Sequence, residues 1–78
     1  MVKKYQGVNV AVLENDTRVE NGATITTEQL VLRGYAHKNA SVKILGHGEL
    51  TKKLSFSGVA AFTASAKEKI EAAGGKIA

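Results

Sequence analysis

Short apolar stretches separated by turn residues run along most of the chain, and they predict several short strands. The expected strands are 8–10, 23–25, 42–45, 52–57 and a brief final one at 76–78. Within 52–57, Leu54 and Phe56 alternate with polar residues, which is the period of two that a strand with one buried side shows. The simplest arrangement joins 42–45 to 52–57 as a hairpin through a turn at 46–51.

A first helix is predicted over residues 27–33. Thr26 precedes it and can cap its free amides, and Glu28 suits the positive end of the helix dipole. Gly34 follows and can adopt the left-handed conformation that commonly ends a helix. Leu30 and its apolar neighbours supply the buried side.

A second helix is predicted over residues 64–73. Thr63 can cap it, Gly74 can end it, and the alanines between them favour helix. Ala66 and Ile70 are spaced to lie on one inner stripe. From the strand 23–25 onward, the order of elements is then strand, helix, two strands, helix and strand, which is an α/β chain with no visible internal repeat.

Composition restricts the class of protein. The chain has 78 residues, which suffices for one small domain, and it has no cysteine for disulfides or thiolate zinc sites. It has no apolar run of the roughly 20 residues that span a bilayer, and its first residues do not resemble a signal peptide. A soluble cytosolic protein is the default expectation, with no membrane partner.

The positive charge is unevenly distributed. The net charge is +4, and residues 1–37 are neutral, whereas 38–78 contain seven lysines and three glutamates. A one-sided basic surface favours a polyanionic partner such as nucleic acid. A lysine-rich solvated surface is the alternative.

The glycines at 46 and 48 invite a test for enzymatic chemistry. A phosphate-binding loop of the Walker type needs a second glycine where Thr51 stands, and a dinucleotide fingerprint needs its third glycine there. His47 has only His37 and scattered carboxylates as possible partners, which is a poor metal site, and no nucleophile motif is present. We therefore expect no catalysis, cofactor, metal or small-molecule substrate.

The same glycines have two further interpretations. Gly46 and Gly48 can turn the chain with positive φ, and they can also let the backbone approach a nucleic-acid phosphate. Lys52 and Lys53 follow the turn and point to opposite faces if the stretch is a strand. At most one of them then lies on the side of Leu54. Whether these residues contact RNA or only shape the fold stays open at this point.

Two long stretches resemble a known family. VKILGHGELTKKLSF at 42–56, followed by FTASAKEKIEAAGGKI at 62–77, is similar to the C-terminal part of bacterial large-subunit ribosomal protein fifteen. The turn at 20–22 and the segment from 27 to 34 resemble that family as well, so the likeness covers nearly the whole chain from about residue 5. The neutral stretch 57–61 departs from the family, whose members usually carry basic residues there.

The resemblance implies a fold and a function. It implies an irregular winding of β-β-α units. A single globular domain is expected over 5–78, preceded by a leader or linker at 1–4. The basic N-terminal arm of the family is expected to be absent. It further implies a non-catalytic cytoplasmic ribosomal constituent that binds large-subunit ribosomal RNA, touches neighbouring ribosomal proteins and is a monomer when isolated. A protein-interaction module and a small nucleotide-binding protein are the alternatives. The candidate RNA-binding residues are Lys38, Lys43, Gly46, His47, Gly48, Lys52, Lys53, Lys67 and Lys76.

Overall fold

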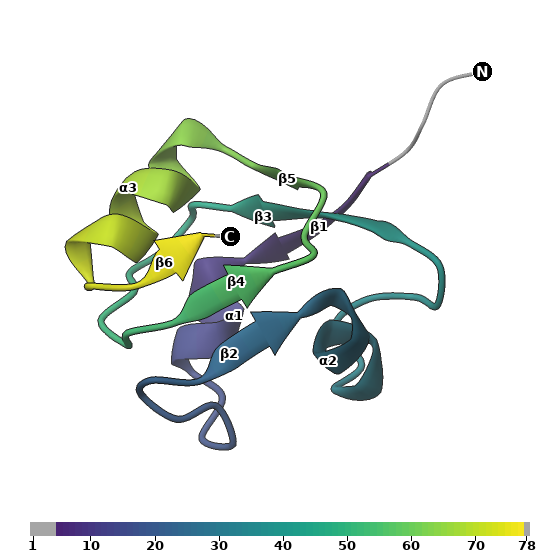
Figure 1. Ribbon diagram of the computed structural model, residues 1–78, viewed down its shortest axis with the longest axis horizontal. Helices are drawn as coiled ribbons and strands as arrows, with labels where there is room; N and C mark the ends of the chain where they lie inside the picture. The colour runs from purple at the N-terminus through teal and green to yellow at the C-terminus, as the bar shows by residue number, and fades with distance from the viewer. Residues whose placement is uncertain (1–4, 78) are drawn as a thin grey trace.

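Six strands and three helices make up the computed structural model of the chain, which describes residues 5–77 (Figure 1). The elements in order are β1 (Tyr5–Asn9), α1 (Val10–Glu14), β2 (Thr24–Thr26), α2 (Thr27–Leu32), β3 (Ser41–Leu45), β4 (Ser55–Ser57), β5 (Ala61–Phe62), α3 (Ala64–Ala72) and β6 (Lys76–Ile77). The predicted α/β class is confirmed, and α2 and α3 are the two predicted helices. The leader or linker expected at 1–4 lies outside the described residues.

The six strands form two parallel three-stranded sheets, with every odd strand in one and every even strand in the other. The spatial orders are β1-β3-β5 and β2-β4-β6. Parallel neighbours cannot be joined by tight turns, so the chain crosses between the sheets after each strand. It makes five crossings: α1 links β1 to β2, α2 links β2 to β3, the stretch 46–54 links β3 to β4, a short stretch at 58–60 links β4 to β5, and α3 links β5 to β6. Two successive strands, one in each sheet, make one turn of the winding, so the described residues contain three turns. This path is the irregular winding that the resemblance implied, and it repeats three times without a matching sequence repeat.

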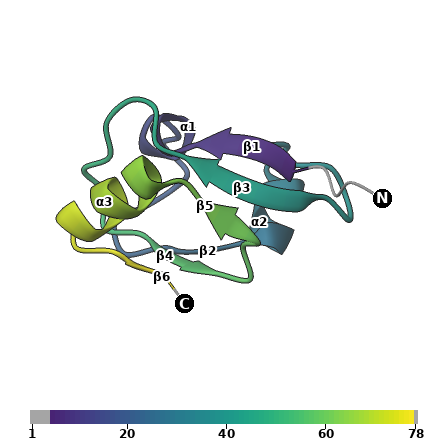
Figure 2. The same cartoon turned by 90° about the horizontal axis from the view of Figure 1, so that it is seen from above.

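One hydrophobic core lies where the two sheets face each other (Figure 2). Val8 and Ile44 contribute from neighbouring strands of one sheet, and Ile25 and Phe56 contribute from the other. Phe56 also meets Phe62 edge-to-face, with ring centroids 5.6 Å apart. Such a ring pair adds about 0.5–1.5 kcal/mol beyond simple burial. Because these two rings belong to different sheets, their contact joins the layers directly.

The predicted helix boundaries follow from local capping. The side-chain oxygen of Thr26 accepts a hydrogen bond from the amide of Gln29, and Thr63 does the same for Ala66, each at 3.2 Å. Each contact satisfies one of the free amides at the start of a helix. Gly34 and Gly74 both have positive φ after their helices, as predicted.

The predicted hairpin between 42–45 and 52–57 is wrong. Strands β3 and β4 belong to different sheets, and the connection 46–54 passes from one layer to the other. Leu50 and Leu54 are both buried along this path, so the connection is held by the core rather than by pairing between strands. The alternation at Leu54 and Phe56 did report burial correctly, but it carries no information on which strand lies alongside.

A short helix was also missed after the first strand. Val10 and Leu13 are fully buried at a spacing of three, and they form the inner side of α1. Val12 is 38% exposed because it lies on the opposite side of that helix. Five residues give too short a periodic pattern to predict a helix.

Candidate nucleic-acid interface

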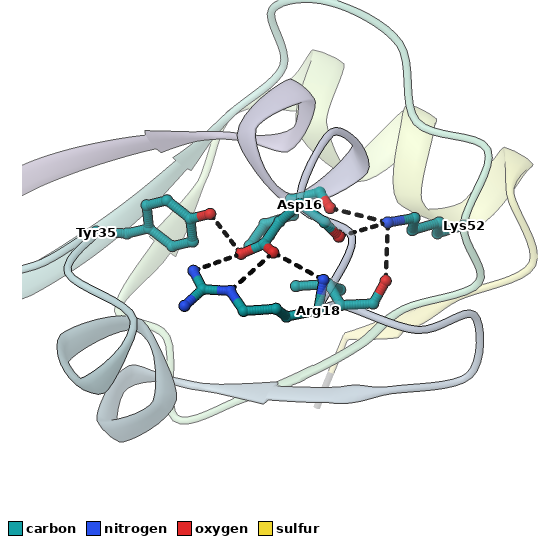
Figure 3. Close-up of polar contacts among 6 residues, drawn as sticks. Asp16, Arg18, Tyr35 and Lys52 are labelled. Carbon is teal, nitrogen blue, oxygen red and sulfur yellow. Dashed lines mark hydrogen bonds and ion pairs between the residues drawn. The ribbon is translucent and has the colours of Figure 1, made fainter.

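Lys52 points inward and holds the loop that follows α1. Its ammonium donates hydrogen bonds to the carbonyl oxygens of Leu13, Asp16 and Val19, at 3.4, 2.8 and 2.8 Å (Figure 3). A cation is favourable at the C-terminal end of a helix, where carbonyl groups lack partners. Lys52 is therefore half-buried among backbone acceptors.

Asp16 anchors the same loop from its other side (Figure 3). Its carboxylate accepts hydrogen bonds from the guanidinium and amide of Arg18 and from the hydroxyl of Tyr35, the last at 2.6 Å. The Asp16 side chain is only 6% exposed. These donors, with the Arg18 side chain first, lower the pKa of Asp16 well below its usual range, and the same contact raises the pKa of Tyr35. The positive charge of Arg18 is thus paired with Asp16 within the fold.

Glu14 fixes the connection 46–54 against the end of α1. Its carboxylate accepts from the hydroxyl and amide of Thr51, at 2.5 and 3.0 Å, and from the amide of Lys52 at 3.1 Å. The hydroxyl of Thr51 is the main cause of a lowered pKa at Glu14. Backbone amides that would pair with a neighbouring strand in a hairpin are satisfied here by one carboxylate.

The two glycines of the turn have different roles. Gly46 does not have the positive φ that was expected; it is buried, and a Cβ there would lie 2.5 Å from the backbone nitrogen of Ala66. Gly48 does have positive φ, at 82°, and a Cβ there would lie 2.5 Å from the Cβ of Ala11. The turn is therefore wedged between the start of α3 and α1.

Lys69 of α3 holds this turn from the inside. Its ammonium donates to the carbonyl oxygen of Gly46 at 2.5 Å and also to that of Gly48. The sequence does not predict this contact, because Lys69 lies far from the glycines in sequence and no local pattern links them. It was absent from the predicted site for that reason.

Three of the predicted lysines gather beside α3 and β6, and we call Lys53, Lys67 and Lys76 the basic face. Lys67 and Lys76 line one shallow groove with Gly75, Glu71 and Ile77. The methylenes of Lys53 lie next to Gly74, 3.8 Å from where its Cβ would be. All three lysines are exposed. Segments distant in sequence thus bring their charges to one surface, around the helix and strand seen side by side in Figures 1 and 2.

The other predicted residues lie elsewhere. Lys38 is exposed and lines a separate groove beside α2. Lys43 is half-buried in the middle of β3, between Gly7 and Ala61 on the neighbouring strands. His47 is exposed at the turn. The nine predicted residues therefore do not form one site.

Between residues 5 and 77, no three histidine, cysteine or carboxylate side chains come together as a potential metal site. No helix begins after the glycine turn, where a phosphate-binding loop would require one, because the next element is β4. Within the same span, none of the helices has the length and apolar character needed to cross a bilayer.

Comparison with known proteins identifies the family of the chain. Residues 7–78 match a family of ribosomal proteins whose description names 50S-L15 and 50S-L18e together with a 60S member. The match covers nearly the whole chain, and the chain belongs to this ribosomal protein family. The family resemblance seen in the sequence is thereby confirmed.

Individual relatives have the same name across distant bacteria. Large ribosomal subunit protein uL15 of Christiangramia forsetii is 50% identical over 96% of this chain and 50% of its own length. The protein of that name from Aquifex aeolicus is 51% identical over 95% of this chain and 48% of its own. That from Corynebacterium jeikeium is 47% identical over 94% and 47%. The chain thus spans about half the length of the curated relatives it matches.

Proposed function

We propose that the chain is a non-catalytic structural constituent of the large ribosomal subunit that binds ribosomal RNA in the cytoplasm. Membership of a ribosomal protein family supports this assignment. The observation that carries the RNA contact is the basic face, where three exposed lysines from the 46–54 connection, α3 and β6 lie on one surface.

The basic face suits phosphate groups rather than base edges. Lysine ammonium groups attract phosphates as point charges, and they provide affinity without reading sequence. The chain has four aromatic residues. Phe56 is buried in the core, Tyr35 and Phe62 pack against it, and Tyr5 is the one exposed ring, which makes no platform by itself. Stacking of unpaired bases on an aromatic platform is therefore not the proposed mode, and shape and charge would position the RNA.

A salt titration with a matched set of variants tests this proposal. We expect affinity for a large-subunit ribosomal RNA fragment to fall steeply with salt. Replacing all three lysines of the basic face by alanine should make the slope of log affinity against log salt shallower by roughly 2 to 3, because each phosphate contact contributes about 0.7–0.9. Lys38→Ala, beside α2, is the single-charge comparison. Equal slopes for the parent and the triple variant would refute the basic face as the RNA contact.

The groove beside α2 supports contact with a protein as a second function. Leu32 is 83% exposed and lines this groove with Val31, Thr27 and Lys38. Val31 and Leu32 together give the groove an apolar lining, and adjoining apolar side chains at the surface favour a protein neighbour over RNA. We propose that a neighbouring ribosomal protein covers it and that the isolated chain is a monomer. Leu32→Ser should weaken the association with that protein without changing its salt dependence. Sedimentation of the chain alone tests the second part, and self-association there would contradict the monomer.

A further inference from the structure

The carbonyl groups of the glycine turn face α3, and this fixes where the next amides point. Lys69 bonds the carbonyl oxygens of Gly46 and Gly48. In a trans peptide the carbonyl and the following N–H point in opposite directions, and the described chain has no cis peptide bond. The amides of His47 and Glu49 therefore both point away from Lys69.

These two amides have no acceptor within the described part of the chain. Neither donates a hydrogen bond to a backbone or side-chain group there, and both residues are exposed, as is Gly48 between them. The turn cannot easily rotate to hide them, because Gly48 is closely packed against Ala11. Two donors thus face outward from alternate residues of a turn that is held in place from behind.

Such a turn has the features that bind oxyanions. Successive backbone amides in a turn form a concave site for phosphate, and donors that are already ordered lose little entropy on binding. The Lys69 ammonium lies on the inner side of the same peptides and adds positive potential. The carboxylate of Glu49 opposes this, so binding by the turn depends on the amides rather than on its side chains.

We propose that the outward side of the turn 46–49 is a phosphate site in which the amides of His47 and Glu49 donate to the oxygens of one phosphate group. Lys69 is a positioning residue that holds the two carbonyls inward. This inference rests on the proposed function, since the phosphate would belong to the RNA backbone. It adds a contact that needs no lysine at the surface and is separate from the basic face.

Amide chemical shifts measured by nuclear magnetic resonance test the site residue by residue. The chain is titrated with inorganic phosphate, and in a second arm with a short RNA duplex, against sodium chloride at equal ionic strength. We expect saturable downfield shifts at His47 and Glu49 in both arms. The amide of Gly58, an exposed glycine that also has positive φ, is the internal control. Shifts at His47 and Glu49 no larger than at Gly58 would overturn the proposal.

Variants on α3 separate positioning from charge. Lys69→Met should weaken phosphate binding at the two amides by about tenfold, the change expected when one charge-assisted contact no longer orders the site. Arg33→Met removes one positive charge at the end of α2 and should leave phosphate binding at these amides near the parent value. Lys69→Arg, which can still donate to both carbonyls, should restore most of it. Equal losses in Lys69→Met and Arg33→Met would refute Lys69 as a positioning residue.

The two RNA-dependent outcomes are distinguishable. If the duplex binds with a steep salt dependence while His47 and Glu49 stay unperturbed, the phosphate site is wrong and the proposed function stands. If the duplex does not bind but inorganic phosphate shifts both amides, the site exists and the RNA function fails. Glu49→Gln should strengthen phosphate binding in either case, because it removes the opposing carboxylate. Unchanged phosphate binding in this variant would contradict the placement of the phosphate at the turn 46–49.

Discussion

The connection 46–54 and the basic face contain the same residue type in opposite surroundings. In and around the connection, Lys52 and Lys69 place their ammonium groups on backbone carbonyls. On the basic face, Lys67 and Lys76 leave theirs in solvent beside a groove. The comparison shows that net charge overestimates how many lysines are available to a polyanion, because Lys52 and Lys69 are hydrogen-bonded to backbone carbonyls within the fold. Lys52 and Lys53 are neighbours in sequence, but Lys52 is bonded to carbonyl groups and Lys53 is exposed on the basic face.

The largest effect is expected from filling the space that the connection leaves at Gly46. In Gly46→Ala, the new Cβ would meet backbone atoms of α3, which cannot move aside like a side chain. Overpacking of this kind costs typically 1–3 kcal/mol, and we expect about 3 kcal/mol lower unfolding free energy. Urea denaturation measures it. Gly58→Ala, where a Cβ meets open space but φ is 74°, should lose about 1 kcal/mol, the usual cost of a left-handed side chain.

The contrast between the neighbouring lysines can be tested directly. Lys52→Met retains the methylene length but leaves the carbonyls of Leu13, Asp16 and Val19 without their shared donor. We expect a loss of about 2 kcal/mol, within the range for unsatisfied buried polar groups. Lys53→Met, with the same loss of charge, should stay within about 0.5 kcal/mol. Thermal and urea midpoints measured side by side give both values, and equal destabilisation would contradict the inward role of Lys52.

Acid should weaken the contacts of Asp16 in the loop after α1 and of Glu14 with the connection 46–54. Asp16 and Glu14 have pKa values lowered by their hydrogen bonds, so the unfolded chain binds more protons than the folded one as the pH falls. Their contribution is complete above the unfolded pKa values, about 4, and declines progressively as the pH drops below them. Unfolding free energy measured between pH 7 and pH 2 should show this slope. Asp16→Asn should flatten it, whereas Glu20→Gln, at an exposed position, should not.

The sequence predicted those parts of the fold that depend on neighbouring residues. The caps at Thr26 and Thr63 and the helix ends at Gly34 and Gly74 rest on contacts close in sequence. The strand 42–45 was visible as a local run of apolar residues, although its partners β1 and β5 are distant along the chain. The alternation at Leu54 and Phe56 also reported the burial of these two residues correctly. Which strands pair could not be read in this way, because a parallel partner lies a whole turn of the winding away and leaves no local pattern.

The candidate site was predictable to a similar extent. The abundance of lysine in the second half pointed to a polyanion, and Lys67 and Lys76 do share a groove. The packing of α1 and α3 determines two contacts that the sequence did not predict. These are the hydrogen bonds of Lys52 to backbone carbonyls and those of Lys69 to the glycine turn. These positions are consequences of the crossing between sheets, which was predicted wrongly as a hairpin.

The alternation of strands between two sheets also has a consequence for how the chain folds. Each sheet takes one strand from every turn of the winding, so neither can be completed until the final turn has been made. Pairings between residues far apart in sequence must form together, which slows folding relative to a helical domain of this size. During synthesis the emerging N-terminal strands would lack their partners. The domain is then expected to fold as one late, cooperative event rather than piece by piece.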